Sequence, residues 1–268
     1  MEQRDGVERE LVQRAQNGDS KAMEQVLAQL APRLHRFSSR LCESHAEDAL
    51  QETLISVATN LPSYRGESAL TSWAFSLVRT ACGRLTRGRK NAAHAPLSEV
   101  GDVQSGGADP EEQALSQERL AAFNCAIQDI AGELREAVLL RDVEGLDAKE
   151  AALAAGVSVS AFKSRLHRGR SALSSAVEKR LHTGATRGSC PDVLLALSRQ
   201  EEDELSGDEC ERLHAHLGEC DKCDHLCKRL KEALGACREP LASHRSEDLQ
   251  LQLRAAYEAW KEAGALDD

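Results

Sequence analysis

Residues 134–173 read LREAVLLRDVEGLDAKEAALAAGVSVSAFKSRLHRGRSAL, and the positions where helices end and begin in this stretch decide the expected fold. Apolar residues recur at helical spacing until Gly145, where a first helix is expected to end. A short second helix with small side chains follows over 148–155. Gly156 supplies the left-handed backbone of a tight turn, and a third helix is expected over 160–174. A short helix, a glycine turn and a longer helix indicate a helix-turn-helix.

The helix expected over 160–174 is amphipathic. Its inward face is expected to consist of Val159, Phe162, Leu166 and Leu173. Its outward face is expected to carry Ser160, Lys163, Ser164, His167, Arg168 and Arg170. In a helix-turn-helix, polar and basic side chains at these places contact base edges and phosphates. An ordinary helical hairpin with a solvated basic face is the alternative interpretation of the same pattern.

The composition of the whole chain favours helices. Only 3% of the residues are aromatic, and Ala, Leu, Glu and Arg are abundant. Strands draw on aromatic and β-branched residues, so this composition argues against a β-sandwich. We therefore expect an all-α protein.

The formal net charge of −10 argues at first against nucleic acid, but the charge is segregated along the chain. Residues 79–90 and 151–177 contain Lys and Arg and no Asp or Glu. The sign of the local charge decides whether a domain binds a polyanion, so both stretches are candidates for DNA contacts. Either stretch taken alone is equally compatible with a solvated helix face.

Composition shifts divide the chain into helical blocks and linkers. The expected parts are 9–90, the flexible linker 91–110, the helix-turn-helix block 111–181, the cysteine-rich block 190–240 and the amphipathic helix 245–266. The linker is rich in Ala, Gly, Ser and Pro and has no periodicity.

Several classes of protein are not expected. The first residues, 1–11, are charged throughout, and no apolar run approaches the roughly 20 residues that span a bilayer. We therefore expect a cytoplasmic protein with no membrane contact. The chain has no phosphate-binding or dinucleotide-binding glycine loop and no convincing Ser/His/Asp arrangement, so we do not expect an enzyme.

Residues 47–53, EDALQET, place Asp48 and Glu52 four residues apart on one helix face, with Gln51 beside them. Two carboxylates at this spacing can form a metal site or an acid/base pair. More often they form a solvated face or a docking surface for a basic partner.

Two segments of the chain resemble one protein family. Residues 134–173 resemble region four of extracytoplasmic-function (ECF) sigma factors, most specifically at KSRLHRGR, residues 163–170. Residues 47–73 resemble region two of the same family and precede region four in the family's order. This resemblance implies an all-α transcription initiation factor with two small helical domains joined by a flexible linker, the second a helix-turn-helix. Its implied partners are the RNA polymerase core and promoter DNA.

The resemblance also implies functional residues. Those that dock on polymerase would be Asp48, Gln51 and Glu52. Those that contact the minus-ten element in region two would be Arg65, Ser68, Thr80 and Arg84. Those that contact the minus-thirty-five element in region four would be Ser160, Lys163, Ser164, Arg165 and Arg168. Thr80 and Arg84 differ from the residues usual in the family.

Six of the nine cysteines lie in the last third of the chain. His216 and Cys220 are four residues apart on one helix face, and Cys223 follows in a CxxC spacing. With Cys190 they make a Cys3His set suited to a closed structural zinc site. Three further tail cysteines, Cys210, Cys227 and Cys237, do not belong to this set. Cys227 and Cys237 are interpreted either as buried core residues or as a second set of thiolate ligands, and both interpretations remain open. Cys42, Cys82 and Cys125, scattered earlier, are interpreted as small buried residues without chemistry.

The cysteine-rich block resembles the zinc-binding anti-sigma fold, whose ligand positions match Cys190, His216, Cys220 and Cys223. A sigma factor fused to such a block resembles the CorE-like group, in which the tail gates activity by metal. This resemblance implies zinc or cadmium and an intramolecular contact between the tail and the sigma domains. A thiol redox-sensing tail and a helix-turn-helix repressor with a structural zinc domain are the alternative hypotheses.

Overall fold

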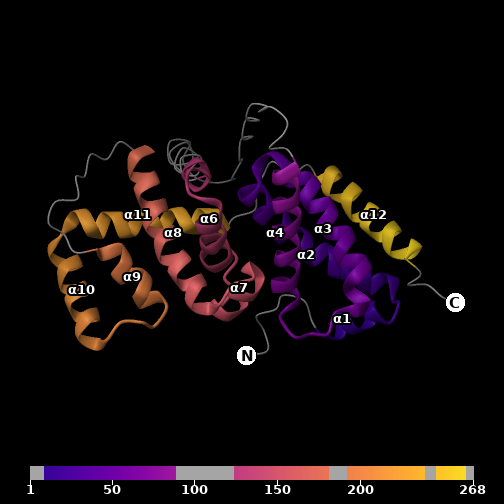
Figure 1. The fold of residues 1–268 in the computed structure, drawn as a ribbon, viewed down its shortest axis with the longest axis horizontal. Helices are drawn as coiled ribbons and strands as arrows, with labels where there is room; N and C mark the ends of the chain where they lie inside the picture. The colour runs from indigo at the N-terminus through magenta and orange to yellow at the C-terminus, as the bar shows by residue number, and fades with distance from the viewer. Residues whose placement is uncertain (1–8, 89–123, 181–191, 239–245, 264–268) are drawn as a thin grey trace, which may run out of the picture. The chain divides into compact units, whose positions relative to one another are not determined.

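The structure, a computed structural model, describes residues 9–88, 124–180, 192–238 and 246–263 (Figure 1). These segments fold into α-helices with short 3-10 and π-helical turns, and they contain no strand. The expected all-α fold is thereby confirmed. No helix among these segments combines the length and the apolar character needed to cross a bilayer.

The contacts between helices divide the chain into two compact units. The first unit contains α1 to α4 and, from the far end of the chain, α12. The second contains α6, the π-helical turn η3, the start of α7, and α8 to α11. The C-terminal third of the sequence therefore contributes helices to both units.

The first unit consists of helices packed around α2. Its elements are α1 (Arg9–Gln16), α2 (Ser20–Leu41), η1 (Glu43–His45), α3 (Ala46–Asn60), η2 (Leu61–Ser63), α4 (Leu70–Gly88) and α12 (Ser246–Glu262). Asp19 caps α2 by accepting a hydrogen bond from the backbone N–H of Ala22 at 3.0 Å. Phe37 of α2 meets Phe75 of α4 edge to face, with ring centroids 4.9 Å apart. Both rings are buried, so they form the centre of this unit's core.

Helix α12 packs lengthwise on α3 and also contacts α2 (Figure 1). Its Ala256 and Trp260 are fully buried, and Trp260 is among the largest buried side chains of the protein. Gln252 donates a hydrogen bond from Nε2 to Glu47 Oε2 of α3 at 2.7 Å. A fully buried tryptophan contributes about 3–5 kcal/mol to packing, so α12 is an integral part of this unit's core.

Cys42 and Cys82 are joined by a disulfide that links the C-terminal end of α2 to α4. Their Cα atoms are 5.6 Å apart, although 40 residues separate them in sequence. The expectation that these two cysteines have no chemistry is therefore wrong. Helical periodicity places each thiol on an inward face, but it does not show that the two inward faces meet.

The second unit begins with the helix-turn-helix. Its elements are α6 (Gly132–Val138), η3 (Leu139–Val143), α7 (Ala148–Ala155) and α8 (Val159–Arg180). Asp147 Oδ1 accepts hydrogen bonds from the backbone N–H groups of Lys149 at 2.8 Å and Glu150 at 2.9 Å, which caps α7. Gly156 has φ +66°, the left-handed conformation expected of the turn before α8.

Helix α8 begins one residue earlier and ends six residues later than the expected 160–174. Phe162, Leu166 and Leu173 are buried as expected. Val159 is 38% exposed, because it stands at the first turn of α8, beyond the reach of α6. Arg170 was expected on the outward face, and this expectation is wrong: its side chain is buried against the carboxylate of Asp142.

Three tail helices complete the second unit: α9 (Val193–Glu201), α10 (Gly207–Glu219) and α11 (Asp221–Arg238). Ser206 and Glu209 form a capping box that starts α10. The buried residues Val193, Leu213, Cys223 and Cys227 form one apolar cluster that joins the three helices. Helix α9 packs on α8, and α11 packs on η3, so the tail helices lie directly on the helix-turn-helix.

Gly169 marks the closest approach of α8 to α6. A Cβ atom at this position would lie 2.7 Å from the carbonyl oxygen of Leu134 and 2.9 Å from Val138 Cγ2. We expect Gly169→Ala to lower the free energy of unfolding of this unit by about 1–3 kcal/mol, since overpacking forces the helices apart. Urea unfolding followed by circular dichroism measures the loss. Gly235→Ala in α11 is the control, because its Cβ meets no atom within 4 Å. An equal response of the two variants would contradict the close helix contact.

Candidate functional site

The outward face of α8 carries most of the predicted DNA-contacting residues of the second unit. Ser160, Ser164 and Arg168 are exposed, and Lys163 is half-buried. They line a groove of about 680 Å³ whose other wall contains Leu195 of α9 and residues that follow it. Arg165 lies apart from this groove and forms an ion pair with Glu133 of α6 at 3.1 Å. The predicted set is thus divided between the groove and the α6 side.

An acidic turn occupies the space beside this face. Residues 201–204 read EEDE and connect α9 to α10. Glu204 Oε1 accepts a hydrogen bond from Lys163 Nζ at 2.7 Å, and its Oε2 lies 3.0 Å from Nε2 of His167. Lys163 first, and His167 after it, lower the pKa of Glu204, so this carboxyl is charged at neutral pH. A carboxylate therefore takes two side chains of the groove as partners.

Arg170 anchors a buried ionic cluster at the base of the same helix. Its Nε donates to Asp142 Oδ2 at 2.9 Å, and its Nη2 donates to Asp142 Oδ1 at 2.5 Å. Its Nη1 donates to Ser198 Oγ of α9 at 2.7 Å. Glu202 joins the cluster through Arg141, whose Nε lies 2.9 Å from Glu202 Oε1. Buried charges of this kind require partners, so the cluster fixes α9 and the acidic turn against α8 and η3.

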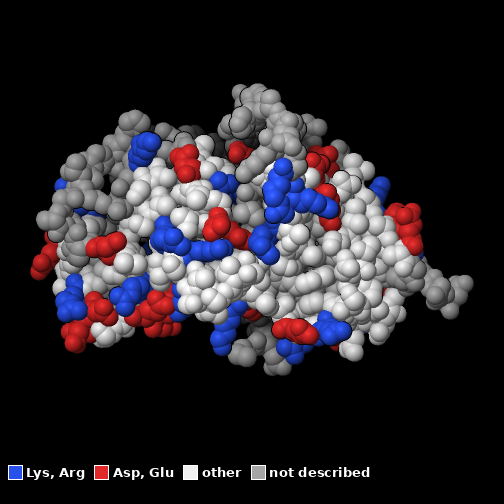
Figure 2. Space-filling model, in the orientation of Figure 1, with Lys and Arg blue, Asp and Glu red and all other residues white. Residues whose placement is uncertain are grey.

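The surface charge reflects this arrangement. In Figure 2, acidic and basic side chains lie interspersed over the part of the molecule that contains α8 to α11. A nucleic-acid-binding surface is normally a continuous basic patch, because each phosphate contact needs a cation nearby. On the groove side of α8, the cation of Lys163 is paired with Glu204 of the acidic turn.

Helix α3 in the first unit presents the residues predicted to dock on a partner protein. Asp48 and Gln51 are exposed on it, and Glu52 is half-buried. Glu52 forms an ion pair with Arg84 of α4, so the predicted docking and DNA-contacting faces of this unit touch each other. Glu47, one residue before Asp48, is the residue that Gln252 of α12 contacts. Helix α12 therefore contacts α3 at the residue next to the predicted docking residue Asp48.

The remaining predicted residues of the first unit lie on the loop before α4 and on α4 itself. Arg65 and Thr80 are exposed, and Ser68 is half-buried. Gly66 has φ +69°, which turns the loop between Arg65 and Ser68. The hydroxyl of Tyr64 donates to the carbonyl oxygen of Ser68 and so ties the two ends of this loop together.

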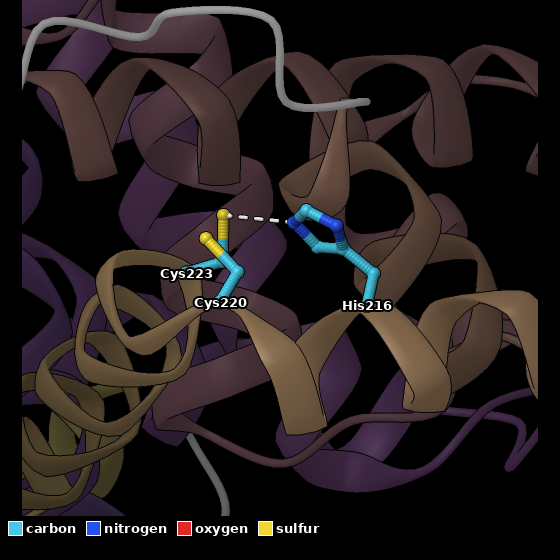
Figure 3. Close-up of side chains that lie close together, drawn as sticks. All are labelled: His216, Cys220 and Cys223. Carbon is cyan, nitrogen blue, oxygen red and sulfur yellow. Dashed lines mark hydrogen bonds between the residues drawn. The ribbon is translucent and has the colours of Figure 1, made fainter.

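The tail brings three predicted metal ligands together (Figure 3). His216 lies in the last turn of α10, Cys220 follows that helix, and Cys223 lies in the first turn of α11. Their donor atoms all lie within 4.8 Å of one another, and His216 Nε2 is 3.3 Å from Cys223 Sγ. Zinc bound about 2.3 Å from sulfur and 2.0 Å from nitrogen holds neighbouring donors at such separations. The geometry and the donor chemistry therefore fit one tetrahedral ion.

The other tail cysteines divide into different groups. The fourth predicted ligand, Cys190, lies outside the described residues. Cys227 is buried in the apolar cluster, and this burial raises the pKa of its thiol, as expected of a core residue. Cys210 is half-buried on α10, and Cys237 lies within α11.

The chain matches two family models in the order expected from its sequence. Residues 26–92 match Sigma-70 region 2, and residues 120–173 match Sigma-70, region 4. The ECF RNA polymerase sigma-E factor of Escherichia coli K12 is 31% identical over 177 residues, which cover 63% of this chain and 93% of that protein.

This chain belongs to the ECF sigma factors of the sigma-70 family.

This sigma factor is also similar to a second curated relative and to a solved structure. The sigma-E factor of Haemophilus influenzae is 29% identical over 180 residues, covering 63% of this chain and 94% of that protein. A co-crystal structure of the sigma factor RpoE with the anti-sigma factor NepR from Bartonella quintana has 23% identity and a TM-score of 0.48. It covers 62% of this chain and 99% of that chain. Sigma factors are transcription regulators that bind DNA, which agrees with the prediction that the chain is not an enzyme.

The family models end at residue 173, so helices α9 to α12 of this sigma factor lie beyond them. The sequence motifs predicted metal ligands in the tail, but they did not predict the contact of the acidic turn with α8. Four consecutive acids, residues 201–204, were the available signal. When the same chain also contains a basic helix, such an acidic run is a candidate to bind that helix.

From the buried Arg170–Asp142 pair of this sigma factor we predict the effect of a substitution on the free energy of unfolding. We expect Asp142→Ala to lower the free energy of unfolding by roughly 3 kcal/mol or more, because it leaves a buried guanidinium without its main partner. Glu133→Ala is the control, because its carboxylate is 72% exposed and pairs with Arg165 at the surface. We expect that control to lose less than about 1 kcal/mol. Urea denaturation of both variants measures the difference, and equal losses would contradict the buried pair.

Proposed function

We propose that this sigma factor directs promoter-specific transcription and that a metal ion, zinc or cadmium, bound to its tail gates that activity. The observation that carries the proposal is the contact of Glu204 with Lys163 and His167 on α8. A helix that reads the minus-thirty-five element uses its basic side chains to contact DNA, and here a carboxylate pairs with Lys163 and also contacts His167.

The first step of the proposed gate is electrostatic. Glu204 brings a carboxylate to the edge of the groove on α8, while Glu202 of the same turn is buried against Arg141 and Arg170. A DNA phosphate that approached this groove would find fewer cations to pair with, and the acidic side chains would repel it. Release of the turn restores Lys163 and His167 to the DNA-facing surface. The state of the acidic turn thus determines the affinity of region 4 for DNA.

The second step connects this turn to the metal ligands. The turn is continuous with α10, and α10 carries His216 at its other end. An ion bound by His216, Cys220 and Cys223 cross-links α10 to the start of α11 and fixes the angle between them. Cys223 also belongs to the apolar cluster that contains Val193 of α9, so the ligands and the α8-contacting helix share one core. A change at the ligands is transmitted to α9 and the acidic turn through this packing.

The tail also contributes to region 2. Helix α12 packs on α3, the helix that carries Asp48, Gln51 and Glu52. In the family these positions dock on the RNA polymerase core, which is the partner we propose here. The gate would therefore act on both surfaces that a sigma factor uses, the polymerase-binding one and the DNA-binding one. Intramolecular contacts of the tail with the sigma regions support this reading.

Metal binding and its effect on transcription test the proposal. We expect the full chain to bind about one zinc ion and the double variant Cys220→Ser/Cys223→Ser to bind none, because two thiolates leave the site. Metal content by atomic absorption measures this, with Cys210→Ser as the control that keeps the three ligands. Run-off transcription with polymerase core is then compared with zinc, with cadmium and with a chelator.

We expect the metals to change the run-off signal of the parent chain and of Cys210→Ser, and to leave the double variant unchanged. A metal response that persists in the double variant would overturn the proposed gate. Loss of transcription in every variant and condition would instead contradict the sigma-factor function itself. Equal responses to peroxide and to metal would favour the alternative, a redox-sensing tail.

Neutralising Glu204 tests the electrostatic step separately. We expect Glu204→Gln to tighten promoter binding about threefold to tenfold at low salt, since it frees Lys163 and His167 and removes one repulsive charge. Glu211→Gln, an exposed acid on α10, is the matched control and removes the same charge away from α8. Fluorescence anisotropy with a promoter duplex measures both. Identical affinities of the two variants would show that the contact with α8 has no influence on DNA binding.

A further inference from the structure

Region 2 contains a pair of cysteines at a junction of its helices. Cys42 terminates α2, where its backbone N–H donates to the carbonyl oxygen of Ser38 at 2.9 Å. Cys82 lies within α4, and the two sulfur atoms are bonded. The Cα–Cα distance of 5.6 Å lies in the range that disulfides adopt, so the bond forms without displacement of either helix.

The two thiols differ in accessibility. Cys82 is 4% exposed, whereas Cys42 is half-buried at a helix end. An oxidant from solution reaches the more accessible sulfur, and the buried one is positioned to resolve the product. Five other described cysteines take no part in a disulfide: Cys125, Cys210, Cys220, Cys223 and Cys227. Within that part of the chain, the bonded pair lies in region 2 and the proposed metal ligands lie in the tail.

We propose that Cys42 and Cys82 form a reversible redox site that responds to hydroperoxides and stabilises region 2 when oxidised. The Cys42 thiolate attacks the peroxide and becomes a sulfenic acid, with release of water. The Cys82 thiol then attacks that sulfur, forms the disulfide and releases a second water. In sum, two thiols and one hydrogen peroxide give one disulfide and two waters. A small dithiol reductant returns both cysteines to thiols by exchange.

The position of the pair decides what oxidation does to the protein. Cys42 directly precedes η1, the turn that leads into the polymerase-facing helix α3. Cys82 lies two residues before Arg84, which pairs with Glu52 of α3. The bond therefore ties α2 and the start of α3 to the DNA-facing helix α4. Since the closed form keeps Asp48 and Gln51 exposed, oxidation stabilises region 2 without covering its docking face.

Where thiols are normally kept reduced, a disulfide is transient and serves redox sensing or protection. The bond closes a loop over a sequence separation of 40 residues, and cross-linking a loop of this size restricts the unfolded chain substantially. The oxidised sigma factor is thus the more heat-resistant form, and this property is independent of the metal ligands.

The full chain is reduced with dithiothreitol, freed of reductant and titrated with hydrogen peroxide. Remaining thiols are alkylated, and digestion with mass spectrometry locates linked peptides. We expect a Cys42–Cys82 linked peptide at peroxide levels that leave Cys125 free to be alkylated. We also expect the unfolding midpoint to rise by roughly 10 °C or more, and dithiothreitol to reverse the rise.

Cys42→Ser and Cys42→Ala are the test variants, and Cys125→Ser is the matched control. We expect the peroxide-dependent rise in midpoint in the control and in the parent chain, and its absence in both Cys42 variants. Oxidation of tail cysteines affects all of these proteins alike, so the difference between them isolates region 2. The proposal is overturned if Cys42 and Cys82 remain as alkylatable as Cys125, or if the linked peptide forms without a rise in midpoint.

Discussion

Arg170 lies on the helix that faces DNA in this family, yet its guanidinium is buried between Asp142 of η3 and Ser198 of α9. A buried guanidinium keeps its charge, so it requires fixed acceptors on every side that solvent no longer reaches. Here the acceptors come from two sources, region 4 itself and the tail. The burial of this one charge therefore depends on α9 lying against α8, and the position of the acidic turn follows from it.

The other tail contacts are of a different kind. Glu204 meets Lys163 and His167 at a partly exposed surface, where an ion pair contributes about 0–1 kcal/mol. The buried cluster thus positions the tail, and the exposed pairs determine which cations remain available to DNA. This division allows the DNA-facing contacts to break while the tail helices stay folded. The apolar cluster that contains Cys223 packs α9, α10 and α11 together and includes one of the predicted metal ligands.

The sequence predicted much of this organisation because local signals decide it. The left-handed turn at Gly156 and the buried positions Phe162 and Leu166 follow from backbone chemistry and periodicity. The errors have a common cause. Arg170 and Cys82 have roles fixed by residues 28 and 40 positions away, and a helical pattern shows a face without showing its partner. The proximity of His216, Cys220 and Cys223 was predictable because they lie within eight consecutive residues of helix and turn, and their role as metal ligands stays a prediction.

A tail attached to the domain that it covers needs only weak contacts. Covalent attachment through a short linker gives an effective concentration in the millimolar range, so contacts that would not hold a separate protein hold this one. The same free-energy balance determines how strongly a regulatory ligand must prefer the open state over the covered state. If the covered state is favoured by about 2–3 kcal/mol, a ligand that binds the open and covered states with a hundredfold difference in affinity suffices to shift the balance. A few polar, partly exposed contacts such as Lys163–Glu204, each contributing about 0–1 kcal/mol, together reach this range, whereas an extensive apolar interface over α8 would not be reversible. The mixture of one buried charge cluster with a few surface pairs therefore suits the tail-dependent regulation that we propose.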